Sequence, residues 1–534
     1  MTDLADPDAP LEIRPLDLPD HVFESLPARV RRHAAERPDA PALGESGGPV
    51  ITWGETGAIV ARAAAKLIAC GLKRGDVIPV LANAPVEYTL AYLAGLTAAG
   101  CVAPLPVMAA DDTLVRMVAD GEGPVMIASA DYRERAEAIL AADPAIAGRR
   151  KLALDFEAPG WEPLFDASAP TPAASELPEI GPDDLFNIIY SSGTTGVPKG
   201  IVHDHMLRTR QWPRMHARGV AADSRMILST PLYSNTTLAG LLPLLAAGGF
   251  VRYQRKFDAV DWFRIVAEEK ITNTMLVPVL VQRLMTHPDF AAADISSLRL
   301  TTCTSSPLAP TIKKRMLDEW PGAVMELYGL TEGGISTTLD LKIDAGKWAS
   351  VGQAAGNAEL MVMDEDCNVL PVGEVGEVIG RSATVMRGYH GRPDLTQKAL
   401  VRLKNGEVYF RTGDLGRIDE DGFLFLAGRK KDMIISGGFN IYATDLEEAL
   451  HTHPEVVEAG VAGAPDEEWG EIPWAGVVLR PGATVTEAEL IAHANARLGK
   501  LQRIKRVFFI DVLPRNAIEK VDKPNLLKLL LSLA

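Results

Sequence analysis

Cysteine is scarce in this 534-residue sequence. The four cysteines, Cys70, Cys101, Cys303 and Cys367, form no CxxC pair and lie beside no histidine cluster. This spacing argues against a disulfide framework and against a structural zinc site. No uncharged apolar run is long enough for a membrane-spanning helix. The acidic start "MTDLADPDAP" is neither a secretory signal nor a basic transit peptide. We therefore expect a cytoplasmic protein without a stable membrane anchor.

Positive charge is also in deficit, because 70 acidic residues outnumber 54 lysines and arginines and give a net charge of -16. This balance disfavours nucleic acid or an anionic membrane as the main partner. It does not exclude a nucleotide, which a few N–H groups and one or two cations can hold. The content of 47% hydrophobic and 23% charged residues is that of an ordinary globular protein. The length is too great for one core, so two or more domains are expected.

Strand-like apolar runs alternate with helical stretches along most of the sequence. Examples are "DVIPVLA" before "PVEYTLAYLAGLTAAG", and "NTMLVP" before "VLVQRLMTH". This rhythm predicts βα units in largely parallel sheets with helices on their faces. After about residue 345, short runs between Gly and Asp turns predict antiparallel strands, followed by a compact block of helix and strand. The charged turn "GRKKD" separates the region of short antiparallel strands from the compact block that follows. We therefore place two domains at 1–430 and 431–534.

The segment "YSSGTTGVPKG" has the composition of a phosphate-binding loop. Its small residues let the backbone approach an anion, its hydroxyls are donors, and Lys199 supplies a positive charge. It follows the strand-like "LFNIIY" and precedes the helical "DHMLRTRQW". It is not a Walker A loop, because Lys199 is followed by Gly200 and no GK[ST] is present. A flexible Gly/Ser turn is the alternative, but it does not explain why strand, hydroxyls, lysine and helix coincide.

Three further segments are weak signals when each is taken alone. In "VMELYGLTEGG", Glu332 follows the end of a strand, where open α/β sheets bind ligands, and could hold Mg²⁺. In "YFRTGDLGRIDEDGFLFLAGRKKD", Asp414 could accept hydrogen bonds from ribose hydroxyls and Arg429 could donate to the same sugar. In "PRNAIEKVDK", Lys520 precedes an apolar terminal helix. A solvated turn residue is the ordinary interpretation of each.

In this order and spacing, the four segments resemble the adenylate-forming superfamily, which includes acyl-CoA synthetases, adenylation domains of peptide synthetases and luciferases. The resemblance extends over almost the whole chain, from "DHVFESLPARVRRHAAERPDAPAL" to "PRNAIEKVDK". It implies an α/β fold with a large N-terminal domain of parallel sheets and flanking helices. A β-barrel-like subdomain and a small mobile α+β C-terminal domain complete the implied fold.

The resemblance also implies roles for individual residues. The implied catalytic residues are Lys520, Glu332 and Thr194, with Glu332 as the metal ligand. The implied ATP contacts are Ser191, Ser192, Gly193, Thr194, Thr195, Gly196, Lys199, Ser305, Ser306, Pro307, Tyr328, Gly329, Thr331, Asp414 and Arg429. Lys520 would bridge the acid's carboxylate and the α-phosphate, and Lys431 would be the hinge of the C-terminal domain. Glu519 departs from the glycine that usually precedes the catalytic lysine.

The expected reaction is ATP- and Mg²⁺-dependent formation of an acyl-adenylate, followed by transfer of the acyl group to CoA. The chain ends soon after Lys520 without a carrier domain, which favours a free thiol. Candidate CoA contacts are Arg252, Arg255, Lys256, Gly437, Gly438 and Phe439. Two alternatives stay open: a stand-alone ligase that loads a carrier protein's phosphopantetheine, and a non-catalytic protein that kept the fold. The oligomeric state stays open, with a homodimer as one possibility.

The acid is expected to be a monocarboxylic acid of moderate size, whether aromatic, cyclic or aliphatic. The predicted lining mixes small and polar residues: Tyr233, Ser234, Asn235, Thr236, Val277, Pro278, Gly329, Gly333 and Gly334. Ser234 stands where the family often has histidine or another aromatic residue. No Asp or Lys stands out to pair with an amino group or a second carboxylate, which disfavours an amino acid.

Overall fold

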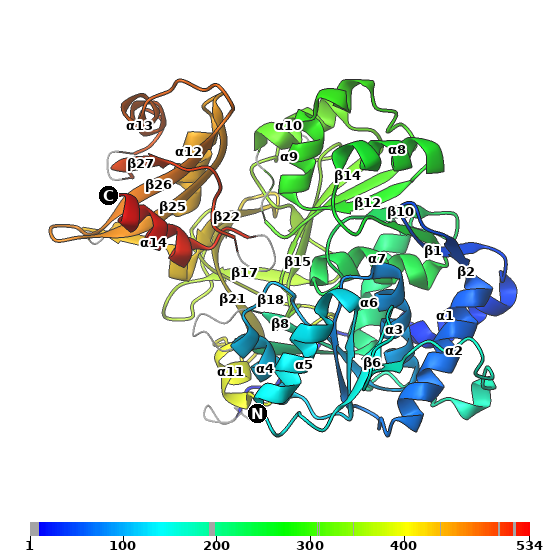
Figure 1. Cartoon of the computed structure of the whole chain (residues 1–534). Coiled ribbons are helices and arrows are strands. Elements are labelled where there is room, and N and C mark those ends of the chain that lie inside the picture. The colour runs from blue at the N-terminus through cyan, green and yellow to red at the C-terminus, as the bar shows by residue number, and fades with distance from the viewer. Residues whose placement is uncertain are drawn as a thin grey trace.

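The structure is a computed structural model that describes residues 10–191, 198–306, 308, 310–344, 346–437, 439–499, 502–515 and 520–534. It consists of a large part and a smaller C-terminal part, which is orange to red at the upper left of Figure 1. None of the helices in these ranges is long and apolar enough to cross a membrane.

Two mainly parallel sheets form the large part. The eight-stranded sheet has the order β19-β9-β8-β4-β3-β5-β6-β7. Its strands are β3 (Val77–Leu81), β4 (Cys101–Pro104), β5 (Val125–Ala128), β6 (Arg150–Ala153), β7 (Glu162–Pro163), β8 (Leu185–Ser191), β9 (Lys199–Asp204) and β19 (Gly388–Tyr389). The strands from β4 to β7 pair in parallel, whereas β8, β9 and β19 pair antiparallel. The predicted parallel arrangement is therefore confirmed, with an antiparallel edge.

The nine-stranded sheet has the order β16-β15-β14-β13-β12-β10-β11-β1-β2. Its strands are β1 (Pro41–Glu45), β2 (Val50–Thr52), β10 (Arg225–Leu228), β11 (Phe250–Tyr253), β12 (Asn273–Leu276), β13 (Leu300–Cys303), β14 (Ala323–Gly329), β15 (Ser336–Asp340) and β16 (Gln353–Ala354). The five strands β10 to β14 pair in parallel. Their carboxyl ends therefore meet at one edge, where such sheets bind ligands.

Helices cover both sheets. They are α1 (Leu26–Glu36), α2 (Trp53–Ala69), α3 (Pro85–Thr97), α4 (Asp111–Asp120), α5 (Arg133–Ala142), α6 (His205–His216), α7 (Asn235–Ala247), α8 (Ala259–Glu269), α9 (Pro278–Thr286) and α10 (Pro310–Glu319). Local signals set their ends: Thr52 and Glu55 form a capping box on α2, and Gly248 ends α7 at φ 81°. Helix α3 is apolar on every side and is buried almost completely, since it packs between other elements.

The predicted antiparallel region is a curled sheet of short strands. It consists of β17 (Glu359–Met363), β18 (Gly376–Arg381), β20 (Leu400–Arg402), β21 (Val408–Ile418) and β22 (Leu424–Arg429), and α11 (Pro393–Lys398) lies beside it. A charged turn, η4 (Lys430–Asp432), follows β22.

The C-terminal part has a sheet and cores of its own. The sheet contains β23 (Ile434–Ser436), β24 (Phe439–Ile441), β25 (Val456–Asp466), β26 (Gly470–Leu479) and β27 (Arg506–Phe509). Helices α12 (Ala443–His451), α13 (Glu487–Asn495) and α14 (Lys523–Leu533) pack on it. Its two hydrophobic clusters contain residues from 434 onward only.

One local prediction needs correction. The helix predicted at "DHMLRTRQW" is present as α6, but the sequence did not predict strand β9, which begins at Lys199 and separates the loop from this helix. Strands β8 and β9 form a hairpin in which Ser191 lies opposite Lys199. The run "KGIVHD" was missed because its apolar stretch is too short to stand out from the helix that follows.

Candidate active site

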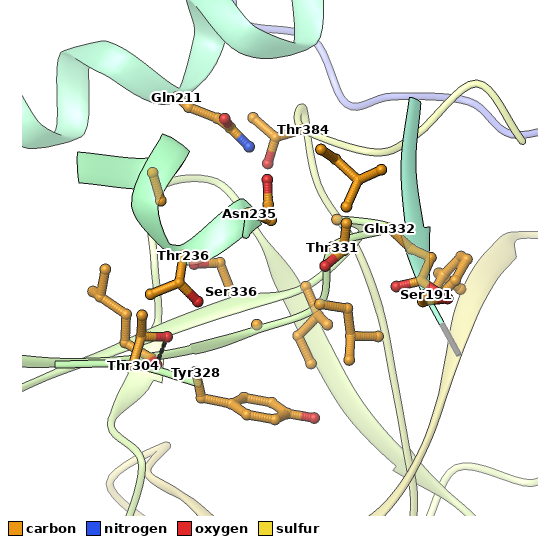
Figure 2. Close-up of a pocket in the computed structure, with 18 of the residues that line it drawn as sticks. Ser191, Gln211, Asn235, Thr236, Thr304, Tyr328, Thr331, Glu332, Ser336 and Thr384 are labelled. Atoms are coloured by element: carbon orange, nitrogen blue, oxygen red, sulfur yellow. Dashed lines mark hydrogen bonds between the residues drawn. The ribbon is translucent and has the colours of Figure 1, made fainter. Parts of the chain in front are cut away.

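A cavity of about 1680 Å³ lies where the two parts meet. Its walls come from the large part, from the curled sheet and from the C-terminal part, which contributes Lys520. Many predicted site residues line it: Ser191, Lys199, Tyr233, Ser234, Asn235, Thr236, Ser305, Tyr328, Gly329, Thr331, Glu332, Gly333, Arg429, Lys431 and Lys520. The fold thus brings residues from six distant segments to one place. Figure 2 shows part of this lining.

The nucleotide side of the cavity is built at the carboxyl ends of β13 and β14. After β13, the hydroxyl of Thr304 donates to the carbonyl of Leu327, 2.8 Å away, which ties the two strand ends together. Ser305 has a positive φ of 88°, and its hydroxyl is 2.5 Å from that of Thr236 at the start of α7. This contact fixes an unusual backbone turn where the sequence predicts the adenine contact.

Tyr328 and Arg429 both hold the carboxylate of Asp414. The phenol of Tyr328 donates to Oδ2 of Asp414 at 2.7 Å, and Nε of Arg429 lies 3.1 Å from Oδ1. Asp414 and Arg429 are register partners on β21 and β22. Burial and the adjacent carboxylate raise the pKa of Tyr328 well above its usual range, so Tyr328 is a hydrogen-bond donor at neutral pH. Asp414 and Arg429, the two residues predicted to bind ribose, therefore meet at Tyr328, whose ring is predicted to stack on adenine.

Glu332 and Lys199 meet around a tyrosine that the sequence did not reveal. The hydroxyl of Tyr389 on β19 donates to Oε1 of Glu332 at 2.8 Å. The ammonium of Lys199 lies 5.2 Å from the centre of the same ring, within range of a cation–π contact. Burial and Glu332 raise the pKa of Tyr389, so its proton stays on the hydroxyl. Tyr389 thus positions the predicted metal ligand beside the predicted phosphate lysine.

The backbone carbonyl of Thr331 is hydrogen-bonded to a buried imidazole, that of His203. Nδ1 of His203 faces the amide nitrogen of Asn187 at 3.1 Å and Nη2 of Arg208 at 2.9 Å. Since both neighbours are donors, Nδ1 accepts, and Nε2 donates to the carbonyl of Thr331 at 2.7 Å. Burial and Arg208 hold the pKa of His203 well below its usual range, so the ring is neutral. No signal in the sequence marks His203, because its role depends on contact across 128 residues.

Lys520 reaches the cavity from the segment before α14. Burial and Arg429 lower its pKa, while Asp414 and Glu332 act in the opposite direction. These influences show that the ammonium lies in the field of three residues predicted for ATP and metal binding. The structure therefore has the C-terminal part turned so that Lys520 faces the nucleotide side.

Other predicted residues lie elsewhere or outside the described ranges. Within those ranges, the cavity lining does not include Val277, Pro278, Gly334 or Ser306. The predicted residues Ser192, Gly193, Thr194, Thr195, Gly196, Pro307 and Gly438 lie outside the described residues.

The residues predicted to contact CoA differ in their ion-pair partners and in their exposure. Arg252 is 6% exposed, pairs with Glu269 at 2.9 Å and donates to the carbonyl of Glu45. A guanidinium satisfied in this way is not available to a phosphate. Arg255 pairs with the carboxylate of Glu45 at 2.8 Å, and Lys256 is exposed. Gly437 follows β23 at φ 56°, and Phe439 is 50% exposed at the start of β24.

Comparison with known proteins agrees with this geometry. Residues 30–390 match the family described as AMP-binding enzyme, and residues 445–520 match the AMP-binding enzyme C-terminal domain. The chain therefore belongs to the AMP-binding enzymes, the adenylate-forming superfamily, and is of the acyl-CoA synthetase type.

The chain is also similar to individual proteins within this superfamily. The chain is 36% identical to an indoleacetate–CoA ligase of Aromatoleum aromaticum over 70% of its length and 73% of the relative's. It is 32% identical to a feruloyl-CoA synthase of an Amycolatopsis species over 92% and 96% of the two lengths. The crystal structure of ATP-bound MatB from Rhodopseudomonas palustris superimposes with a TM-score of 0.84 at 30% identity, covering 95% and 99% of the two chains.

Proposed function

We propose that this enzyme uses ATP to convert a carboxylic acid into an acyl-adenylate and then transfers the acyl group to CoA, with release of pyrophosphate and AMP. The observation that carries this proposal is the position of Lys520, which enters the same cavity as Tyr328, Glu332 and Arg429 from the other part of the chain. Relatives named as CoA ligases support the reaction class.

In the first step, a carboxylate oxygen attacks the α-phosphorus of ATP, and the bond to the pyrophosphate oxygen breaks. Both reactants are anions, so the site must neutralise charge and hold them in line. We infer that Lys520 bridges the acid's carboxylate and the α-phosphate and that Thr331 contacts the α-phosphate. Lys199 would hold the leaving pyrophosphate, together with the predicted loop hydroxyls. The ribose would bind Asp414 and Arg429.

The residues at Glu332 fit a magnesium ion. One carboxylate close to a phosphate-binding lysine suits Mg²⁺, which keeps most of its ligands as water and nucleotide phosphate. When bound, the ion would neutralise charge on the phosphate oxygens. Tyr389 would hold the Glu332 carboxylate in the orientation that this requires.

In the second step, the thiol attacks the carbonyl carbon, the bond to the adenylate oxygen breaks, and the thiol proton passes to solvent as AMP leaves. Lys520 must withdraw before the thiol can enter. We place the domain boundary at 430/431, with Lys431 in the charged turn as the hinge. Rotation there would remove Lys520 and bring the Gly437–Phe439 segment to the thiol path.

An assay of pyrophosphate release with ATP, CoA and a panel of acids tests this function. We expect acid-dependent release, and formation of an acyl-CoA when CoA is present. Activity that requires a phosphopantetheinylated carrier protein in place of CoA would favour the alternative of a carrier-loading ligase. Absence of acid-dependent pyrophosphate release would contradict both.

A further inference from the structure

The end of the cavity formed by α6 carries polar groups that the reaction above does not use. Arg210, Gln211 and Arg214 project from this helix into the lining. Figure 2 shows Gln211, Asn235 and Thr384 with their polar tips turned toward one another, on the opposite side of the view from Tyr328. We expect a hydrocarbon tail to be poorly matched to such an end.

Arg214 is the most unusual of these side chains. It is half-buried and lines the cavity, and Nη1 donates to the hydroxyl of Ser336 at 2.5 Å. Its Nε is buried without a hydrogen-bond partner in the described part of the chain. Burial, reinforced by the neighbouring cation Arg218, lowers the pKa of Arg214 to about 10, so it is still charged at neutral pH. At the cavity, the hydrogen-bond partner of this charged guanidinium is therefore a neutral hydroxyl, that of Ser336.

Two other buried arginines show what complete satisfaction of such a group looks like. On the same helix, Arg208 donates through its three nitrogens to Asn187, Gln211 and His203. Arg252 is paired with a carboxylate. Arg214 lacks such a set of partners, as does Arg210 on the same helix, whose Nε is likewise buried without a partner among the described residues, and both line the cavity.

A second unmatched group lies at the same end. Oδ1 of Asn235 is buried and has no hydrogen-bond partner among the described residues. Gly333 has φ 71°, and a Cβ there would lie 2.0 Å from the carbonyl oxygen of Thr384. This close approach brings the Thr384 segment against the turn after Glu332 and closes the polar end. An oxygen acceptor on a ligand would complete the hydrogen bonds of the Arg214 donor, whereas Oδ1 of Asn235 needs a donor such as a hydroxyl or a water molecule.

Arg214 is linked through β15 to the predicted acid pocket. Its partner Ser336 is the register partner of Gly329, a residue predicted to line the acid pocket. The charges that influence Lys520 are Arg429, Asp414 and Glu332, whereas the charge that influences Arg214 is Arg218.

We propose that the acid substrate carries an oxygen acceptor, a carbonyl or a second carboxylate, at the end remote from the carboxylate that is activated, and that Arg214 donates to this oxygen. This inference rests on the proposed function and identifies the substrate class. The sequence did not suggest it, because Arg214 lies in a helix outside every motif and its cavity position depends on the pairing of β14 with β15.

The test uses sets of acids that share a carbon skeleton and differ at the far end. Straight chains of about five to nine carbons end in methyl, in methyl ketone or in carboxylate, and benzoates carry the corresponding para groups. The wild-type enzyme should show kcat/KM for pyrophosphate release at least about tenfold higher for an oxygenated acid than for its methyl-ended counterpart. The ketone and carboxylate arms distinguish a neutral from an anionic acceptor.

Arg214→Met should reduce this preference about 10- to 100-fold, and Arg218→Met, a matched loss of charge two residues beyond α6, should leave it unchanged. If Arg214→Met fails to fold, Arg214→Lys, which keeps the charge with fewer donors, should retain part of the preference. A wild-type preference for methyl-ended acids throughout, or an unchanged preference in the folded Arg214 variants, would overturn the inference. Absence of pyrophosphate release with every acid would instead contradict the proposed function.

Discussion

The hydroxyl of Tyr389 donates a 2.8 Å hydrogen bond to Oε1 of Glu332, and the ring of Tyr389 faces the ammonium of Lys199. One aromatic side chain thus links the candidate metal ligand to the candidate pyrophosphate lysine. The three residues are distant in sequence, and β9 and β19 bring two of them together by pairing at the edge of the eight-stranded sheet.

Tyr389→Phe should weaken the use of Mg²⁺. Without the hydroxyl, the Glu332 carboxylate loses a donor that fixes its orientation, although the aromatic face toward Lys199 is retained. The apparent Mg²⁺ concentration for half-maximal pyrophosphate release should rise about 3- to 10-fold, in keeping with the loss of one hydrogen bond to a charged group. A variant with unaltered Mg²⁺ dependence would show that Tyr389 is not a positioning residue.

Lys520→Ala should abolish adenylate formation, by at least about 100-fold, because a cation that stabilises the transition state is lost. The variant should largely retain thioester formation when acyl-adenylate and CoA are supplied, since Lys520 must withdraw for that step. Separate assays of the two half-reactions measure both effects. Equal loss of both would be inconsistent with a rotating C-terminal domain.

Asp414→Asn should impair recognition of the ribose. The carboxylate accepts from Tyr328 and pairs with Arg429, and an amide can do neither as well. The KM for ATP should rise about tenfold, whereas the KM for 2′,3′-dideoxy-ATP should change much less because its sugar cannot donate to residue 414. Comparable increases for both nucleotides would assign Asp414 a structural role instead.

His205 should make stability depend on pH below neutrality. Burial lowers its pKa to about 4, compared with 6.5 in the unfolded chain, so the proton binds the unfolded state more tightly. Its contribution is constant above about pH 6.5 and declines as the pH falls toward 4, by about 2 kcal/mol between pH 6.5 and 5.

Replacement of His205 by phenylalanine tests this pH dependence. The His205 ring already packs edge-on against Phe186, with 4.8 Å between ring centres, and neither of its nitrogens has a partner in the described structure. His205→Phe should show a smaller fall in melting temperature between pH 7 and 5 than the wild type. An identical fall would indicate that His205 is not the titrating group.

The sequence predicts a large share of this architecture, because hydrophobic periodicity and turn residues act locally. The strands and helices of the βα units fall where the alternation places them, as β12 (Asn273–Leu276) and α9 (Pro278–Thr286) show. Tyr328 and Thr331 could be predicted as neighbours of a ligand because they follow the carboxyl end of a strand.

The remaining site residues escaped prediction for a common physical reason. Tyr389, His203 and Arg214 act through contacts that strand pairing or helix packing creates, and a spacing pattern does not encode such contacts. In the same way, Arg252 looked like a free basic residue until its pairing with Glu269 was visible.

Different turns of helix α6 support the two substrate sites that we propose. Its first turn carries Arg208, which holds His203 and through it Thr331 on the predicted nucleotide side. Its later turns carry Gln211 and Arg214, which line the cavity where we propose that the acid binds. Gln211 accepts from Arg208, but Arg214 donates to Ser336 instead, so the nucleotide side can remain intact while residue 214 changes. This division makes the later turns of α6 a place where selection, or an engineer, can alter which acid is accepted without rebuilding the reaction.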